Sequence, residues 1–282
     1  MSVSLKPDNI PSLEGKVFLS PVATAGKQSI LEFSKHGPKQ TWLGARSQAK
    51  AQEAIDDIKA QIPNTPPIKC LHMDLGKFHS VRQSAKSFVQ QSNRLDNLLL
   101  NAGIMADPAG TTEGGYEIKI GTNHMGHALL TKLLLSTLLK TAEEPNSDVR
   151  ATVLAAASRR FAPKEGVLFE TLKTEASNLG TTNRFPSLNP GMVKIYLSTT
   201  MKRKSWFTRI AYNIAATFMR VDLLTGTFNQ LWASTAKDVI SGTYYEPVGR
   251  AGLGKPHTQN DALAKNLWDW MESELKDEKI DL

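Results

Sequence analysis

The sequence predicts an α/β fold, a doubly wound parallel sheet with helices on both faces. Short apolar runs of strand length alternate with stretches of helical periodicity along the first half of the chain. The runs are largely apolar throughout, as expected of parallel strands that are buried on both faces. They also break at polar or glycine-containing turns, most clearly where Leu98-Leu99-Leu100 is followed by Asn101-Ala102-Gly103.

Each element is predicted from its local pattern. A helix begins after Ser47, a residue suited to cap it, because Ala51, Ile55 and Ile58 recur at helical spacing before Pro63 ends the pattern. The predicted strands are 16–22, 40–45, 68–73, 95–100, 151–157 and a short one at 242–245. The predicted helices are 27–35, 48–62, 81–89, 117–139, 206–224 and 261–275.

Length and composition predict one globular domain. The chain has 282 residues without a repeat or a long linker, so we expect a single domain over 1–282, in which the part from about residue 200 forms a lid over the substrate. The formal charge is +7, but lysine and arginine are spread along the chain, and we expect no nucleic-acid partner.

Cysteine usage and hydropathy indicate the compartment. Cys70 is the single cysteine, so an intrachain disulfide is impossible and a reducing compartment is favoured. The first 14 residues lack the apolar core of a signal peptide, and no apolar run reaches the length of a membrane span. We therefore expect a cytoplasmic protein without an integral membrane span.

The carboxyl ends of the strands are where a doubly wound sheet binds its ligand. After the first strand, the turn from Ser20 to Lys27 has one glycine, Gly26, where a dinucleotide site usually has several. A plain strand-to-helix turn explains this segment equally well. After the second strand, Arg46 stands where an acidic residue would bind the ribose 2′-hydroxyl of NAD. A cation there favours a 2′-phosphate, hence NADP, and a surface arginine at a helix start is the alternative.

Further turns carry a set of motifs in order. They are Asp74-Leu75, Asn101-Ala102-Gly103, Gly121-Thr122-Asn123-His124, Ser158 and Pro190-Gly191. With them the chain resembles the short-chain dehydrogenases/reductases, which have a Rossmann-like fold, and within these the retinol-dehydrogenase-like group common in fungi. The resemblance covers nearly the whole chain and implies an NADP-dependent oxidoreductase of secondary metabolism.

The resemblance also implies roles for single residues. Asp74 would contact the adenine, Asn101 would stabilise the central strand and the cofactor site, and the segment from Pro190 to Val193 would line the nicotinamide. Lys132 would lie on the cofactor side, although an ordinary helix lysine is an equal alternative.

Catalysis in this family needs a proton donor for the alkoxide that hydride transfer leaves. The family uses a tyrosine with a lysine four residues later, a serine that orients the substrate and an asparagine that holds a relay water. Ser158 matches the serine and Asn123 matches the asparagine. None of the five tyrosines, Tyr116, Tyr196, Tyr212, Tyr244 and Tyr245, has a lysine four residues later.

The missing dyad is best explained by a deletion. Asn183-Arg184-Phe185 runs directly into Pro186 and the Pro190-Gly191 motif, which leaves the sixth strand and its helix incomplete. That helix often forms the subunit interface in the family, so we expect exposed apolar surface and a weakened homodimer. The glycine turn is also shortened.

Two hypotheses follow. The first is an NADP-dependent enzyme that interconverts a carbonyl and an alcohol on a small, apolar metabolite. The second is a catalytically dead relative that acts by binding, or the product of a gene model with exon edges misplaced near residues 22–26 and 185–186. A metal site built on His124 and His127 is disfavoured, because no carboxylate or thiol cluster accompanies them.

Overall fold

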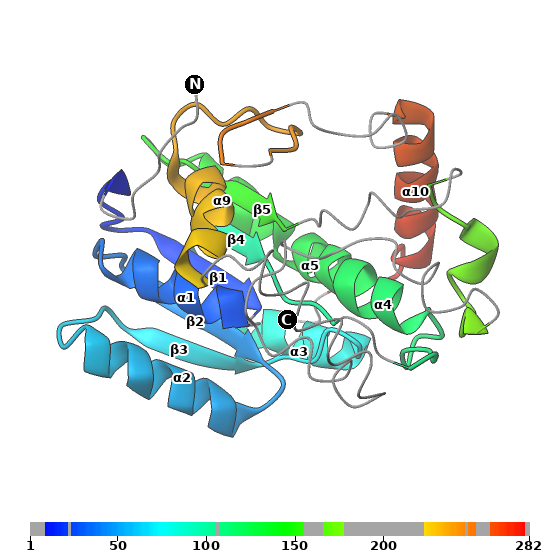
Figure 1. Cartoon of the computed structure of the whole chain (residues 1–282), viewed down its shortest axis with the longest axis horizontal. Helices are drawn as coiled ribbons and strands as arrows, with labels where there is room; N and C mark the ends of the chain where they lie inside the picture. Colours follow the sequence, from blue (N-terminus) through cyan, green and yellow to red (C-terminus); the bar gives the residue numbers. More distant parts are fainter. Residues whose placement is uncertain are drawn as a thin grey trace, which may run out of the picture.

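A parallel five-stranded sheet with helices on both faces forms the fold (Figure 1). The computed structural model describes residues 9–21, 24–104, 108–154, 166–177, 223–245, 248–251 and 260–279. Its strands are β1 (Val17–Pro21), β2 (Gln40–Ala45), β3 (Ile68–His72), β4 (Asn97–Leu100) and β5 (Arg150–Val153). Its helices are α1 (Thr24–Ser34), α2 (Gln48–Gln61), α3 (Phe78–Val89), α4 (Ile118–Ile120), α5 (Gly126–Ala142), α9 (Leu223–Thr235) and α10 (Asp261–Glu274), with a π-helical turn at Gly121–Met125 and a 3-10 turn at Phe169–Thr171.

The strand order creates one reversal point. The order is β3-β2-β1-β4-β5 and every pair is parallel, with Phe18 opposite Asn97 and Leu19 opposite Leu98 where β1 meets β4. The chain therefore winds outward from β1 in both directions. Such a reversal opens a crevice beyond the carboxyl ends of β1 and β4, and this is where ligands bind in open α/β sheets.

Alternating strand residues build two cores. Val17 and Leu19 of β1 belong to a large cluster with α3, α5 and α10, whereas Phe18 points to the other face and packs with Phe33 of α1 and Leu231 of α9. Figure 1 shows α9 beside α1 and α10 standing beside α5. The predicted fold class, a doubly wound parallel sheet, is confirmed.

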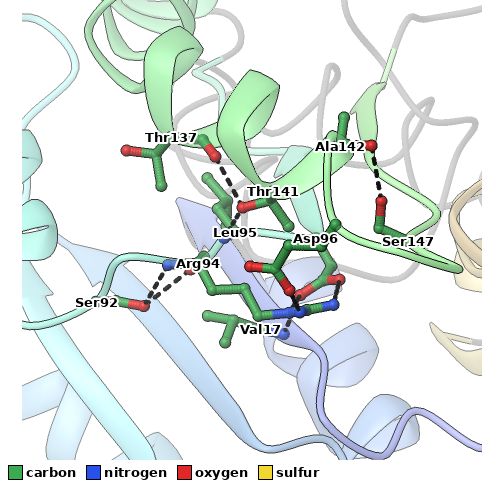
Figure 2. A network of polar contacts seen from close by, with 10 residues as sticks. Val17, Ser92, Arg94, Leu95, Asp96, Thr137, Thr141, Ala142 and Ser147 are labelled. Atoms are coloured by element: carbon green, nitrogen blue, oxygen red, sulfur yellow. Dashed lines mark hydrogen bonds and ion pairs between the residues drawn. The ribbon is translucent and has the colours of Figure 1, made fainter.

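A polar network fixes the opposite, amino-terminal edge of the sheet (Figure 2). Asp96 is 1% exposed; its carboxylate accepts the backbone N–H of Val17 at 2.8 Å and two hydrogen bonds from Arg94 at 2.7 and 2.8 Å. Thr141 at the end of α5 accepts the N–H of Leu95 at 3.0 Å. The starts of β1 and β4 are thus fastened to each other and to α5, far from the carboxyl ends.

Most predicted elements are confirmed and two need correction, whereas the predicted helix 206–224 lies, except for its last two residues, outside the described part of the chain. The predicted cap is present, because the hydroxyl of Ser47 accepts the N–H of Lys50. The predicted strand at 242–245 is wrong: Tyr245 forms only an isolated bridge with Ala251, since Gly242 has a φ of 74° and turns the chain. The long helix 117–139 is not continuous, because the π-helical turn interrupts it.

Among the residues described, no helix is both long and apolar enough to cross a bilayer.

Candidate functional site

Gly26 and Asn101 meet beyond the carboxyl ends of β1 and β4, at the reversal point of the sheet. Gly26 lies in the first turn of α1, and a Cβ there would stand 2.9 Å from Nδ2 of Asn101 and 3.3 Å from Oγ of Ser20. A larger residue at this position would require the Asn101 side chain to shift, so glycine suits the close approach of α1 to the strand ends. The topology brings these two predicted residues together although 75 positions separate them in the sequence, counting from 26 to 101.

The Asn101 side chain lacks partners in the described part of the protein. It is 7% exposed, and neither its amide nitrogen nor its amide oxygen forms a hydrogen bond. Leaving such a group buried and unpaired costs about 1–3 kcal/mol, so buried amides are normally satisfied. A polar ligand in the crevice would remove this cost. The unpaired amide therefore fits a polar ligand on this side of the site, and a nicotinamide dinucleotide is the ligand that the sequence resemblance implies.

Arg46 and Asp74 follow the two neighbouring strands. Arg46 is the first residue after β2 and is exposed. Asp74, two residues beyond β3, is held at both ends: its N–H donates to Oγ of Ser80 at 3.0 Å, and its Oδ1 accepts the N–H of Gly76 at 3.1 Å. Both side chains thus stand at the carboxyl edge of the sheet.

Asn123 braces the loop that follows β4. Its Oδ1 accepts the N–H of Ile104 at 2.8 Å and its Nδ2 donates to the carbonyl of Ile104 at 3.0 Å. Gly103 makes this contact possible, since a Cβ there would lie 3.1 Å from Oδ1 of Asn123. Both ends of the amide are used in holding the backbone. The side chain of Asn123 therefore serves as a brace, and a relay water would depend on its backbone carbonyl.

His127 lies one turn beyond Asn123 and contacts its backbone. Its Nδ1 is 3.0 Å from the carbonyl oxygen of Asn123, and its ring is 6% exposed. Burial lowers the pKa of His127 to about 4, so the ring is neutral near pH 7. Because a carbonyl oxygen can only accept, Nδ1 carries the proton.

Two helix glycines let this region close on the loops beside it. A Cβ on Gly126 would lie 2.3 Å from the carbonyl oxygen of Leu75, and one on Gly121 would lie 2.4 Å from Cγ2 of Thr112. Each position therefore admits only glycine unless its neighbour moves. The contact at Gly126 fixes the distance between α5 and the loop that carries Asp74.

The remaining predicted residues lie elsewhere. Lys132 donates from Nζ to the carbonyl of Leu275 at 2.8 Å and is 3.7 Å from Glu272, so its ammonium group binds the end of α10. It lies nine residues beyond Asn123, about 13 Å along the helix. Ser158 and Val193 lie outside the described residues.

Tyr116 forms a tyrosine–lysine contact of a different kind from the predicted dyad. Its hydroxyl donates to Glu274 at 2.8 Å, and Lys173 donates to the same carboxylate at 2.9 Å while lying 5.5 Å above the ring. Burial and the carboxylate raise the pKa of Tyr116 above its ordinary value. A catalytic tyrosine needs a lowered pKa, so Tyr116 does not have the property expected of the proton donor. The cluster instead joins α10 to the loop before α4.

Sequence reasoning missed Gly126, Ile104 and the role of His127. Gly126 could have been suspected, because glycine inside a helix costs about 1 kcal/mol and usually marks a close approach. The brace on Ile104 uses backbone atoms, which any residue supplies, and so leaves no signal in the sequence.

Comparison with known proteins identifies the same family. A family model described as short chain dehydrogenase matches residues 23–146. A short-chain dehydrogenase/reductase of Aspergillus calidoustus is 30% identical over 97% of this chain and 98% of its own length, and one of Phomopsis amygdali is 31% identical over 95% and 92%. Human retinol dehydrogenase 13 is 38% identical over 42% of this chain and 35% of its own length.

Solved structures share the fold. An uncharacterised protein of Mycobacterium paratuberculosis superimposes with a TM-score of 0.65 at 19% identity, covering 99% of each chain. Levodione reductase gives 0.55 at 12% identity, with 78% of this chain and 90% of its own covered. A short chain dehydrogenase of Shigella flexneri complexed with NADP gives 0.52 at 16% identity, with 79% and 93% covered.

Proposed function

The chain belongs to the short-chain dehydrogenase/reductase family, and from that membership we propose that it is an NADP-dependent oxidoreductase that interconverts a carbonyl and an alcohol on a small, apolar metabolite. The observation that carries the proposal is the unpartnered, buried amide of Asn101 facing Gly26 at the reversal point of the sheet. Asp74 would hold the adenine and Arg46 the 2′-phosphate. A bound nicotinamide would supply or accept the hydride.

The chain's own residues would then orient the reactants. Asn101 would complete its amide hydrogen bonds on the ligand, and the Asn123 brace would keep the loop from Asn101 to Ile104 in place for it. Ser158 would orient the substrate carbonyl, Val193 would lie beside the nicotinamide, and the part of the chain from about residue 200 would close over the substrate. We propose that it is a single-domain protein of the cytoplasm.

Arg46 provides the test of cofactor choice. We expect wild-type protein to bind NADPH more tightly than NADH in a titration that follows nicotinamide fluorescence. Arg46→Met should weaken NADPH binding about tenfold or more, because a charge-assisted hydrogen bond contributes about 1.5–3 kcal/mol, and should leave NADH binding unchanged. Lys50→Met, which removes an exposed cation from the first turn of α2, four residues after Arg46, is the matched control. Equal loss for both cofactors, or no NADPH binding by wild type, would contradict the proposal.

The second candidate is a protein that binds the cofactor without turnover. The absence of a Tyr-x-x-x-Lys dyad from the sequence favours it. Incubating bound NADPH with apolar aldehydes and ketones, and following its absorbance, separates the two candidates. Sequencing the transcript across codons 183–187 decides whether the natural protein carries the dyad; if it does, the binding-only candidate applies to the shortened chain alone.

A homodimer is the proposed assembly. Leu135 and Leu139 lie one turn apart on α5 and are 46% and 57% exposed, which gives an apolar stripe for a second copy. Loss of the helix that carries the tyrosine and lysine in other family members would weaken this dimer. Light scattering of wild type and of Leu139→Glu across protein concentration tests it, and a monomer at every concentration would refute it.

A further inference from the structure

The π-helical turn before α5 carries a chain of hydrogen bonds that ends at the cofactor loop. Inside this turn the backbone bonds shift register, so that the N–H of Gly126 reaches the carbonyl of Gly121, five residues back. Asn123 lies within the shifted segment. The regular hydrogen bonds of an α-helix therefore do not by themselves fix the orientation of Asn123.

His127 supplies one fixed point for that segment. Its Nδ1 lies 3.0 Å from the carbonyl oxygen of Asn123, and its ring is buried at 6% exposure. The ring is neutral and Nδ1 carries its proton, so Nε2 carries a lone pair and can only accept a hydrogen bond. Nε2 has no hydrogen-bond partner among the described residues. Burying a histidine whose second ring nitrogen has no hydrogen bond costs folding free energy, and an apolar residue at this position would avoid that cost.

Asn123, whose backbone is held by His127, is hydrogen-bonded through its side chain to the loop after β4. Its two amide bonds to Ile104 fix a backbone segment that begins at Asn101, three residues earlier. Gly103 lies against the same amide. A rotation of the Asn123 peptide would therefore move the segment on which Asn101 stands.

We propose that His127 is a positioning residue for the cofactor loop: it holds the Asn123 carbonyl, and through the Asn123 side chain it holds the backbone from Asn101 to Ile104. His127 touches neither cofactor nor substrate in this scheme. The effect on cofactor affinity rests on the proposed function, whereas the effect on the loop does not.

The test compares three variants by amide hydrogen exchange and by NADPH titration. His127→Leu removes the donor and keeps an apolar side chain. His127→Asn keeps a donor nitrogen at the position of Nδ1, two bonds from Cβ. Leu130→Ala, at a residue of the same helix with 0% exposure, lowers overall stability and leaves the hydrogen bond intact.

His127→Leu should speed exchange of the Ile104 amide about tenfold, as loss of roughly one hydrogen bond predicts, and should weaken NADPH binding by a similar factor. His127→Asn should restore both to within about twofold. Leu130→Ala should leave local exchange at Ile104 unchanged. Unchanged exchange in His127→Leu, or failure of His127→Asn to restore it, would overturn the proposal. If wild type binds no NADPH, the proposed function fails and the exchange rates alone still decide the role of His127.

Discussion

His127 should make the stability of the fold depend on pH in a way that the structure lets us calculate. Its pKa falls from 6.5 to about 4 on folding, because burial disfavours the charged ring. Above pH 6.5 both states are neutral and its effect on stability is constant. Between pH 6.5 and 4 the unfolded chain binds a proton that the folded protein does not, so stability falls as pH falls.

The magnitude follows from the size of the shift. A difference of about 2.5 units at 1.36 kcal/mol each gives about 3 kcal/mol of stability lost between pH 7 and pH 4. Urea unfolding at a series of pH values measures it. His127→Asn has no ring to titrate, and carboxylates titrate alike in both proteins, so between pH 7 and pH 4 the unfolding free energy of wild type should fall by about 3 kcal/mol more than that of the variant.

The measurement needs a control for the second buried histidine of this region, His124. His124, whose pKa burial also lowers, remains in both proteins and interacts with His127, so His124→Asn measures its share in parallel. If the wild-type and His127→Asn curves run parallel from pH 7 to pH 4, the ring is not held neutral and buried. The reasoning about its hydrogen bond to Asn123 would fail with it.

Further predictions concern packing and charge. Asp96→Asn should destabilise the fold by roughly 3 kcal/mol in urea unfolding, because it leaves Arg94 without its buried partner; a loss below 0.5 kcal/mol would refute this role. Gly126→Ala should lower the melting temperature despite the better helix propensity of alanine, since its Cβ would meet the carbonyl of Leu75; a raised melting temperature would show that the two segments are not in contact. Lys132→Met should cost less than about 1 kcal/mol of stability and leave NADPH affinity unchanged, whereas a large loss of affinity would place its ammonium group at the cofactor.

Apolar periodicity predicted the fold well because the central strands β1, β2 and β4 are buried on both faces. The strand Gln40–Ala45 has the predicted bounds, since its apolar residues end abruptly at an exposed arginine. The π-helical turn could not be predicted, because a shift of one hydrogen bond barely changes the spacing of apolar residues along a helix. The false strand at 242–245 has strand-forming tyrosines, but no neighbouring strand pairs with it in the described sheet.

The candidate site was predictable to the extent that strand ends converge. The proximity of Gly26 and Asn101 follows from topology alone, because parallel strands that flank the reversal point deliver their next residues to one crevice. The helix face of Lys132 was not predictable, since a helix lysine can serve either the cofactor or the packing of another helix. Its bond to the end of α10 depends on where a segment more than 140 residues later returns.

The two halves of the proposed site come from separate parts of the chain. Apart from Val193, the residues proposed to bind the cofactor lie between Gly26 and Asn101, on a continuous stretch of alternating strands and helices. Ser158, which is proposed to orient the substrate, comes after β5, and the sequence has no Tyr-x-x-x-Lys dyad. Both candidate functions therefore require NADPH binding and differ in turnover. Affinity and turnover measured on one preparation decide between them, since binding without hydride transfer would assign the chain to the binding-only candidate.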